Sequence, residues 1–189
     1  MTALVEANDE GDKLSTEELV ATVTTLLFAG IETTSSLLGN AMVALARHPE
    51  QRDLIRAQPE LWPNAVEELL RWDAPIEVAQ RTATADLEIA GQKIKKGSPF
   101  IVSILGANRD PDFYDNPNEL HLDRPDPRPL SFGHGIHHCL GAALARLELR
   151  VGLQEFMDEF GDYTIDDSKI VWKRNTPMRG PTYLPIRRG

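Results

Sequence analysis

The longest helical pattern in this sequence runs without a break from Ser15 to about Arg47, and it constrains the fold more than any other feature. Ser15, with Glu18 three residues later, forms a capping box, which marks the start of a helix. Pro49 marks the point by which the helix has ended, since proline disfavours a helical conformation in the residue before it. We therefore predict a mainly α fold with one long central helix.

The other predicted elements are shorter. Proline at a first turn and apolar periodicity indicate helices, whereas β-branched runs bounded by turns indicate strands. Helices are expected over 49–57, over 63–72, and from Cys139 or Leu140 to about Phe160. Extended segments are expected over 78–90 and 93–94 around a turn at 91–92, over 100–105, and in a tail over 163–186 with turns at 175–177 and 179–181. Residues 110–129 form a long irregular segment rich in Pro, Asp and Asn, which is usually functional or packed under another element. The fold class is mainly α with small β-sheets.

Composition excludes several classes of protein. A chain of 189 residues is long enough for one domain with a buried core, or for a large piece of a bigger domain. The net charge of −9 argues against a nucleic-acid partner, because phosphate binding needs a basic footprint. One cysteine cannot form an intramolecular disulfide, and Met1 to Asp12 lacks the apolar core of a signal peptide. The most apolar stretch, Leu19 to Ile31, is too short to span a bilayer. We expect a soluble, cytoplasmic protein without a membrane partner.

Cys139 is predicted at the first turn of a helix, directly after a loop that contains Gly133 and Gly135. Unpaired N–H groups and the positive end of the helix dipole both stabilise a thiolate at such a position. The two glycines permit unusual backbone conformations, and Gly141 leaves room beside the sulfur for a flat ligand. This arrangement suits an iron ligand or a nucleophile. Two alternatives stay open: a buried, inert cysteine, and a zinc site made by Cys139 with its histidine neighbours His134, His137 and His138.

The run from Phe132 to Gly141 resembles the haem-binding loop of the cytochrome P-450 family, F-G-x-G-x-H-x-C-x-G, at every fixed position. The resemblance implies that Cys139 is the proximal thiolate ligand of haem b. It also implies that His137 bonds a haem propionate and that Phe132 packs near the thiolate, where it limits solvent access.

Other motifs of the same family follow in the required order. Ala29 to Thr34 lies inside the long helix, where Gly30 and Thr33 alone would indicate ordinary helix packing. With the cysteine loop present, this segment resembles the family's oxygen-activation motif, in which Glu32 and Thr33 form an acid–alcohol pair and Ala29 and Gly30 face the haem. Glu68 and Arg71 resemble the E-x-x-R pair, which taken alone would be an ordinary surface ion pair.

Further residues are assigned by the resemblance. Arg124 is the candidate third member of the Glu68–Arg71 group, and Arg81 resembles the arginine that meets a haem propionate. The residues expected to face substrate are mostly small or apolar: Ala29, Gly30, Thr33, Ile76, Glu77, Val78, Ala79 and the turn from Thr176 to Met178. These imply a small lipophilic substrate, oxidised by reductive activation of dioxygen at haem iron.

The sequence shows no membrane anchor, and in this it resembles the soluble bacterial members of the family. Those members take electrons from a ferredoxin or flavodoxin. Arg146 and Arg150, extended by Arg47, Arg52 and Arg56, are expected to form either a basic patch that steers such an acidic partner or an ordinary solvated surface.

The chain departs from the family in length. The resemblance covers nearly all of residues 1–189, but these residues match only the C-terminal half of the family pattern. The long helix is then expected to expose apolar faces. Three hypotheses follow: a monooxygenase whose N-terminal half is missing here, a non-catalytic haem-binding or structural remnant that self-associates, and a zinc or redox-thiol protein.

Overall fold

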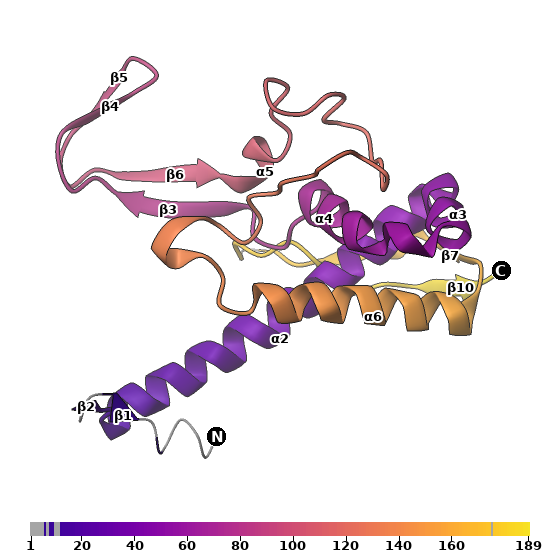
Figure 1. The fold of residues 1–189 in the computed structure, drawn as a ribbon, viewed down its shortest axis with the longest axis horizontal. Helices are drawn as coiled ribbons and strands as arrows, with labels where there is room; N and C mark the ends of the chain where they lie inside the picture. The colour runs from indigo at the N-terminus through magenta and orange to yellow at the C-terminus, as the bar shows by residue number, and fades with distance from the viewer. Residues whose placement is uncertain (1–5, 7, 10–11, 175) are drawn as a thin grey trace.

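The long helix α2 (Thr16–Arg47) extends from the N-terminal end of the molecule into the middle of the other helices (Figure 1). The computed structural model describes residue 6 and residues 8–9, 12–174 and 176–189. Much of the leading segment Met1 to Asp12, on which the expected absence of a signal peptide rests, and Asn175 of the expected turn lie outside the described residues.

The predicted capping box at the start of α2 is confirmed. The Glu18 N–H donates to the Ser15 hydroxyl at 3.2 Å, and the Ser15 N–H donates to the Glu18 carboxylate at 2.8 Å. The helix ends at Arg47, directly before α3 (Pro49–Ala57), whose first residue is the proline that the sequence indicated. The physical signals at both helix ends therefore act as predicted.

The core lies where the C-terminal half of α2 meets α4 (Trp62–Trp72) and α6 (Ala142–Phe160). Leu45, Leu70 and Leu149, one from each helix, are at most 1% exposed. A short 3₁₀ turn, η1 (Pro59–Leu61), joins α3 to α4. Burial of these apolar side chains removes them from water and holds the three helices together, at roughly 1.5–3 kcal/mol for each large side chain.

All the described strands form two-stranded antiparallel pairs. The pairs are β1 (Asn8–Asp9) with β2 (Asp12–Lys13), β3 (Val78–Thr82) with β6 (Pro99–Ser103), β4 (Leu87–Ile89) with β5 (Gln92–Ile94), β7 (Tyr163–Ile165) with β10 (Ile186–Arg188), and β8 (Val171–Trp172) with β9 (Pro181–Tyr183). The β4–β5 hairpin projects away from the helices (Figure 1). The 3₁₀ turn η3 (Asp167–Lys169) separates β7 from β8.

The strand expected over 100–105 ends earlier, at Ser103. The Ser103 hydroxyl accepts the Gly106 N–H at 3.0 Å and caps the short helix α5 (Ile104–Ala107). This local cap converts the last two residues of the expected strand into helix. The long irregular segment after it, residues 110–129, contains no helix or strand, as predicted.

The N-terminal half of α2 is apolar and exposed, as expected for a helix without its usual neighbours. Phe28 and Ile31 are 61% and 69% exposed. The stretch from Leu19 to Ile31 is short, but α2 as a whole is long and apolar enough to cross a membrane by length and composition. This is weak evidence for a span, because the core helix of a soluble protein passes the same test.

The deeply buried Tyr163 makes the fold less stable at alkaline pH. Burial raises the pKa of Tyr163 to about 12, against the opposing charges of Arg52 and Arg56. Its hydroxyl donates to the Met42 carbonyl at 2.9 Å. Because the folded pKa lies above the unfolded value, the stabilisation is complete below about pH 10 and is lost as pH rises toward about 12.

We therefore expect the free energy of unfolding to fall by about 2 kcal/mol over this range, and Tyr163→Phe to remove that part of the fall. Urea unfolding at several alkaline pH values measures it, with Tyr183→Phe, at the 58% exposed tyrosine, as the control. Equal slopes for wild type and Tyr163→Phe would contradict the assignment.

Candidate active site

The loop before α6 presents Cys139 at the protein surface. Gly133 and Gly135 adopt φ of 70° and 73°, in the left-handed region that glycine adopts without strain. A 3₁₀ turn, η2 (Gly135–His137), follows, and the Cys139 N–H then donates to the Phe132 carbonyl at 2.9 Å. The loop thereby folds back on itself. The thiol is exposed, so the alternative of a buried, inert cysteine is wrong.

The helix after the loop begins later than the sequence suggested. It starts at Ala142, with Gly141 as its N-cap, and the Ala142 N–H donates to the Cys139 carbonyl at 3.3 Å. Cys139 therefore precedes the first turn instead of lying in it. The loop hydrogen bonds, which sequence periodicity does not register, hold the chain out of the helix until Gly141.

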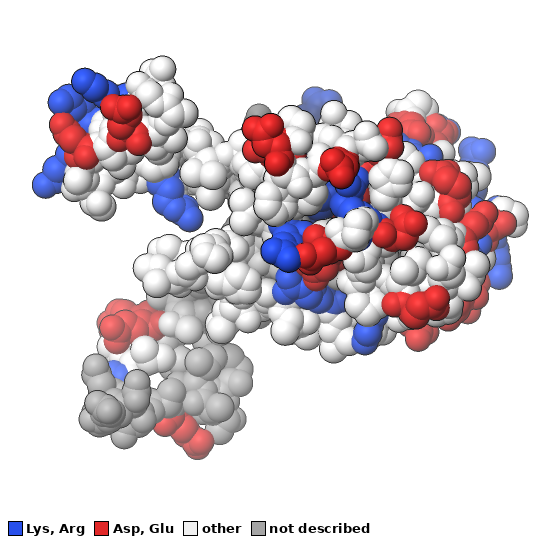
Figure 2. Space-filling view, turned by 45° about the horizontal axis from the view of Figure 1, so that its top comes forward, with Lys and Arg blue, Asp and Glu red and all other residues white. Residues whose placement is uncertain are grey.

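A cleft of about 660 Å³ lies between the cysteine loop, the start of α6 and the middle of α2. Its walls are mainly apolar or small, with Glu148 as the charged residue among them, and are formed by Leu26, Ala29, Gly30, Ile31, Thr33, Thr34, Ser35, Leu38, Phe132, Cys139, Leu140, Gly141, Leu144, Ala145 and Glu148. Figure 2 shows almost no charged side chains on the surface between the β4–β5 hairpin and the N-terminal end of α2. The structure thus brings Cys139 opposite Ala29, Gly30 and Thr33.

The donor set and shape of this cleft fit a haem group. A thiolate is a ligand that haem iron accepts, and apolar walls suit the porphyrin faces. A Cβ atom at Gly141 would lie 4.0 Å from the Cys139 sulfur, so the glycine keeps the space beside the sulfur open. A Cβ at Gly30 would meet nothing within 4 Å, so this part of α2 also leaves space beside the helix.

Glu32 and Thr33 are neighbours in α2 but do not face the same side. The Thr33 side chain lines the cleft, and its hydroxyl donates to the Ala29 carbonyl at 2.6 Å. The Glu32 side chain is not among the cleft-lining residues, and its carboxylate accepts the Lys173 ammonium at 2.8 Å. The predicted acid–alcohol pair is therefore divided between two faces of the helix. Sequence analysis missed Lys173, since nothing local connects it to Glu32.

Glu68, Arg71 and Arg124 meet in a buried cluster behind the site. Glu68 and Arg71 are 0% exposed and form a bidentate pair, with nitrogen–oxygen distances of 2.6 and 2.8 Å. Arg124 reaches the same carboxylate at 3.1 Å. The reading of Glu68–Arg71 as an ordinary surface pair is wrong, because both side chains are fully buried.

A fourth buried residue, Asn108, connects this cluster to the cysteine loop. Arg71 donates to the Asn108 backbone carbonyl at 2.9 Å, and the Asn108 side chain accepts the Leu130 N–H at 2.8 Å and donates to Ser131 at 2.9 Å. The Ser131 hydroxyl then donates to the Leu70 carbonyl on α4 at 2.7 Å. Asn108 and Ser131 were not predicted, because one sequence does not reveal which polar residues are buried.

The predicted propionate ligands lie outside the cleft itself. Arg81 is exposed on β3, where its guanidinium donates to the Gln80 carbonyl at 2.8 Å. His137 is exposed at the end of η2. The loop that carries His137 passes below β3, the strand that carries Arg81, in the view of Figure 1.

Of the predicted substrate-facing residues, Ala29, Gly30 and Thr33 line the cleft, whereas the two segments outside α2 meet each other but do not line it. Ile76 pairs with Met178 in an isolated antiparallel bridge, and Thr176 accepts the Met178 N–H at 3.3 Å. Glu77 accepts the Ile104 N–H through its backbone carbonyl, while Val78 and Ala79 begin β3.

An ion pair holds this region to the end of α4. Arg179 donates to Asp73 at 2.7 Å. Burial raises the pKa of Asp73, and the Arg179 charge opposes that shift. The pair of Arg179 with Asp73 thus holds the turn from Thr176 to Met178 beside the end of α4.

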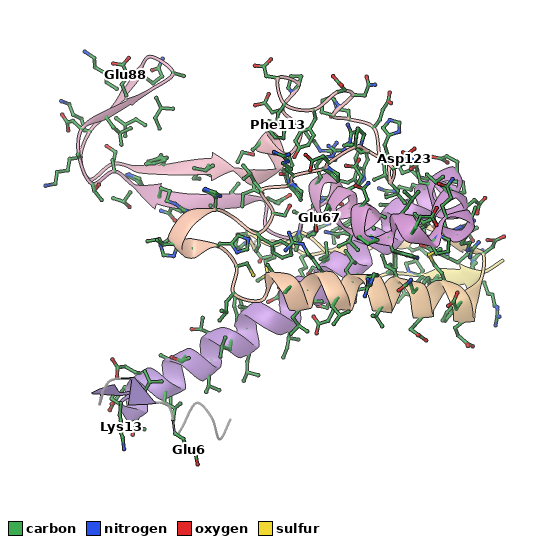
Figure 3. All side chains as sticks on the ribbon, in the orientation of Figure 1. Glu6, Lys13, Glu67, Glu88, Phe113 and Asp123 are labelled. Carbon is green, nitrogen blue, oxygen red and sulfur yellow. The ribbon has the colours of Figure 1, made fainter. Side chains whose placement is uncertain are left out.

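The expected basic patch is only partly present. Arg47 pairs with Asp167, Arg56 pairs with Asp162, and Arg52 is 7% exposed, so these three do not extend an unpaired basic face. Glu67, which lies on the side of α4 that faces α6 (Figure 3), pairs with Arg146 at 2.5 Å. Within the described part of the chain, no group of three or more His, Cys, Asp or Glu side chains converges as a metal site would require, which leaves the zinc hypothesis without a ligand set.

The profile of the family described as Cytochrome P-450 matches residues 1–180 of the chain. The polyketide biosynthesis cytochrome P-450 PksS of Bacillus subtilis (strain 168) is 40% identical over 189 residues, which are 98% of this chain and 47% of that protein. The 6-deoxyerythronolide B hydroxylase of Saccharopolyspora erythraea is 40% identical over 190 residues, 99% of this chain and 47% of that protein.

A solved structure extends the comparison to the fold. The Bacillus subtilis 168 bacillaene polyketide synthase cytochrome P-450 PksS matches with a TM-score of 0.93 at 40% identity, over 98% of this chain and 48% of that one. The predicted fold class, mainly α with small sheets and part of a larger fold, is confirmed. The chain spans about half the length of the curated relatives it matches.

Proposed function

Because the chain belongs to the cytochrome P-450 family, we propose that residues 1–189 form the C-terminal part of a haem–thiolate monooxygenase. One observation carries the proposal. The exposed thiol of Cys139 faces the Ala29–Thr33 segment of α2 across an apolar cleft of about 660 Å³. Cys139 would hold the haem iron as a thiolate, and the small side chains of the facing α2 segment would leave room for a flat group in the cleft.

The residues around the cleft would hold haem b in defined roles. Cys139 would bind the iron as a thiolate, with Phe132, Gly133, Gly135 and Gly141 shaping the loop around the sulfur. His137 and Arg81 would bind the propionates from the segments beside the cleft, and Ala29 and Gly30 would lie over the opposite face. When bound, the haem supplies reductive activation of dioxygen, a chemistry that no amino-acid side chain provides.

Thr33 and Glu32 would handle protons on the distal side. The Thr33 hydroxyl donates to Ala29, so its oxygen lone pairs stay available to order water in the cleft. Glu32 would take protons from solvent and pass them toward Thr33. Because its carboxylate lies on the other face of α2, this transfer would need a change of the Glu32 side-chain rotamer. Thr33 would thus order the water along which protons move in the cleft, and Glu32 would supply the protons.

Small lipophilic molecules are the substrates we propose, and a ferredoxin or flavodoxin the electron donor. The names of two relatives refer to polyketide biosynthesis and to hydroxylation of 6-deoxyerythronolide B, and the walls of the cleft in this chain are mainly apolar or small. Ile76 to Ala79 and Thr176 would contact the substrate at the edge of the site. We place the protein in the cytoplasm, without a membrane or nucleic-acid partner.

The absorption spectrum of the purified, reduced protein under carbon monoxide tests the proposal. A strongly red-shifted Soret band identifies thiolate-ligated haem, whereas an ordinary band identifies a neutral ligand. We expect the red-shifted band. A chain that takes up no haem, or shows the ordinary band alone, would contradict the function proposed here.

The exposed apolar half of α2 favours a second candidate, a non-catalytic haem-binding or structural remnant that self-associates. Val20, Leu27, Phe28 and Ile31, all on α2, are each at least 58% exposed, and exposed apolar surface of this kind favours association. Turnover with a surrogate reductant separates the two candidates. Product formation supports the monooxygenase, and haem binding without turnover in a self-associated form supports the remnant.

Thr33→Ala should uncouple electron use from product formation. Loss of the hydroxyl removes the group that orders water at the cleft, and a positioned proton donor contributes about a hundredfold or more to a step that needs it. We expect product per electron to fall by about tenfold, with the electrons recovered as hydrogen peroxide. Oxygen, peroxide and product assays measure this ratio.

Thr25→Ala is the matched control for that experiment. Its hydroxyl makes the same bond one turn back, to Ala21 at 2.8 Å, and its side chain does not line the cleft. The control should keep the wild-type ratio. Unchanged coupling in Thr33→Ala would remove Thr33 from the proton path.

A further inference from the structure

The C-terminal β8–β9 hairpin is fitted tightly against α2 beside Glu32. A Cβ atom at Gly180 would lie 2.6 Å from the Cβ of Ser36, and one at Gly39 would lie 2.6 Å from Pro181. Both contacts are closer than any side chain permits, so only glycine allows the hairpin to approach the helix. The Lys173 N–H donates to the Gly180 carbonyl at 2.9 Å. The backbone of Lys173 is therefore held at a fixed place relative to α2.

From this position the Lys173 ammonium meets the Glu32 carboxylate. Its nitrogen lies 2.8 Å from a Glu32 oxygen and 2.8 Å from the Ser36 hydroxyl. The Ser36 hydroxyl in turn donates to the Glu32 backbone carbonyl at 2.7 Å. The side chain of Lys173 is 14% exposed and that of Glu32 is 36% exposed. A pair this sheltered is screened less than a surface pair, and it orients the carboxylate.

We propose that Lys173 is a positioning residue that holds Glu32 for proton delivery, an inference that rests on the function proposed above. The ion pair keeps the carboxylate on the hairpin side of α2 while Thr33 faces the cleft. In each delivery Glu32 takes one proton from solvent while it is paired with Lys173, then leaves Lys173 by a change of side-chain rotamer to release that proton toward Thr33, and returns to the pair; Lys173 keeps its own protons throughout. Without Lys173 the carboxylate has no fixed partner on the hairpin side, so it loses the defined position from which it takes up protons.

The first test measures coupling in the haem-loaded protein. Lys173→Met removes the charge at similar length, and we expect product per electron to fall by at least about tenfold, as positional errors of this kind do. Lys173→Arg keeps a cation and should recover much of the loss, with the substrate KM unchanged in both variants. Lys93→Met, at an exposed lysine of β5, is the control and should match wild type.

A merely structural role for Lys173 would give a different result. It would lower haem content or the melting temperature while leaving product per electron, counted for each bound haem, unchanged. That outcome, or equal coupling in Lys173→Met and wild type, would overturn the proposal. Failure of arginine to improve on methionine would also count against it, because both variants leave the hairpin backbone intact.

The second test needs no haem. Nitrogen NMR of the lysine side chains observes the Lys173 ammonium directly, with its signal assigned by its loss in Lys173→Arg. Glu32→Gln should move this signal, and Glu17→Gln, at an exposed glutamate of the same helix, should not. An unmoved signal in Glu32→Gln would overturn the proposal whether or not haem binds.

The two tests separate the inference from the function on which it rests. A chain that never shows the red-shifted carbonmonoxy band fails the proposed function, and the catalytic role of Lys173 falls with it, even where NMR still reports the contact. A chain that shows the band and keeps full coupling in Lys173→Met overturns the role of Lys173 alone. The band, the NMR shift and the coupling loss together support both.

Discussion

Replacing Cys139 with serine is expected to abolish the red-shifted carbonmonoxy band completely. A serine hydroxyl is a hard donor that stays protonated near neutral pH, so it cannot replace a thiolate on haem iron. The loop should keep its shape, because its hydrogen bonds use backbone groups: the Cys139 N–H to Phe132, and the Ala142 N–H to the Cys139 carbonyl. The variant should therefore lose the ligand and keep the fold.

The measurement compares reduced, carbon monoxide-treated spectra at equal protein concentration, with far-UV circular dichroism as the check on folding. His138→Gln is the matched control, because this exposed neighbour occupies a variable position of the loop motif. It should retain the red-shifted band. A red-shifted band that persists in Cys139→Ser would remove Cys139 from the site, since the chain has no second cysteine to replace it.

Local signals made the helices predictable from sequence. The Ser15–Glu18 box acts through atoms three residues apart, and Pro49 acts on its own backbone and the residue before it, so both carry their information within one turn. The same is true of Gly133 and Gly135, whose positive φ values match the conformational freedom that the sequence analysis assigned to them.

Long-range contacts were not predictable in the same way. The Glu32–Lys173 pair joins residues that are 141 positions apart, and the Arg71–Asn108 bond joins residues 37 apart. Each depends on how α2, α4 and the C-terminal strands pack, which no local pattern specifies. Arg52 shows the same limit. It was expected on an exposed face, either as part of a basic patch or as solvated surface, but it is buried against the Tyr163 carbonyl and Asp162.

The buried carboxylate of Glu68 is the position where a single substitution should cost the fold most. Glu68 accepts four hydrogen bonds, two from Arg71, one from Arg124 and one from the His121 N–H. Arg71 donates all five of its N–H groups, two to Glu68 and the others to the carbonyls of Asn108, Pro117 and Glu119. The guanidinium groups of Arg71 and Arg124 therefore depend on one buried carboxylate for charge compensation.

Glu68→Gln should lower the free energy of unfolding by about 3–5 kcal/mol, because breaking a buried pair from one side leaves uncompensated charge. The amide keeps the size of the side chain but loses its charge, and its NH₂ group faces donors where an acceptor is needed. Glu67→Gln, one position along α4, is the matched control. Its pair with Arg146 is partly exposed, with side chains 23% and 38% accessible, so its loss should cost less than about 1 kcal/mol.

Urea unfolding followed by circular dichroism gives both values, and the spectrum of the loaded protein gives the consequence for the site. Because Arg71 contacts Asn108, which holds Leu130 and Ser131 at the start of the cysteine loop, Glu68→Gln should also reduce haem uptake where Glu67→Gln does not. Equal stabilities for the two variants would show that the cluster is no more than an ordinary ion pair. A destabilised Glu68→Gln variant with normal haem uptake would instead show that the cluster does not control the cysteine loop. The backbone hydrogen bonds of the loop would then be what positions Cys139.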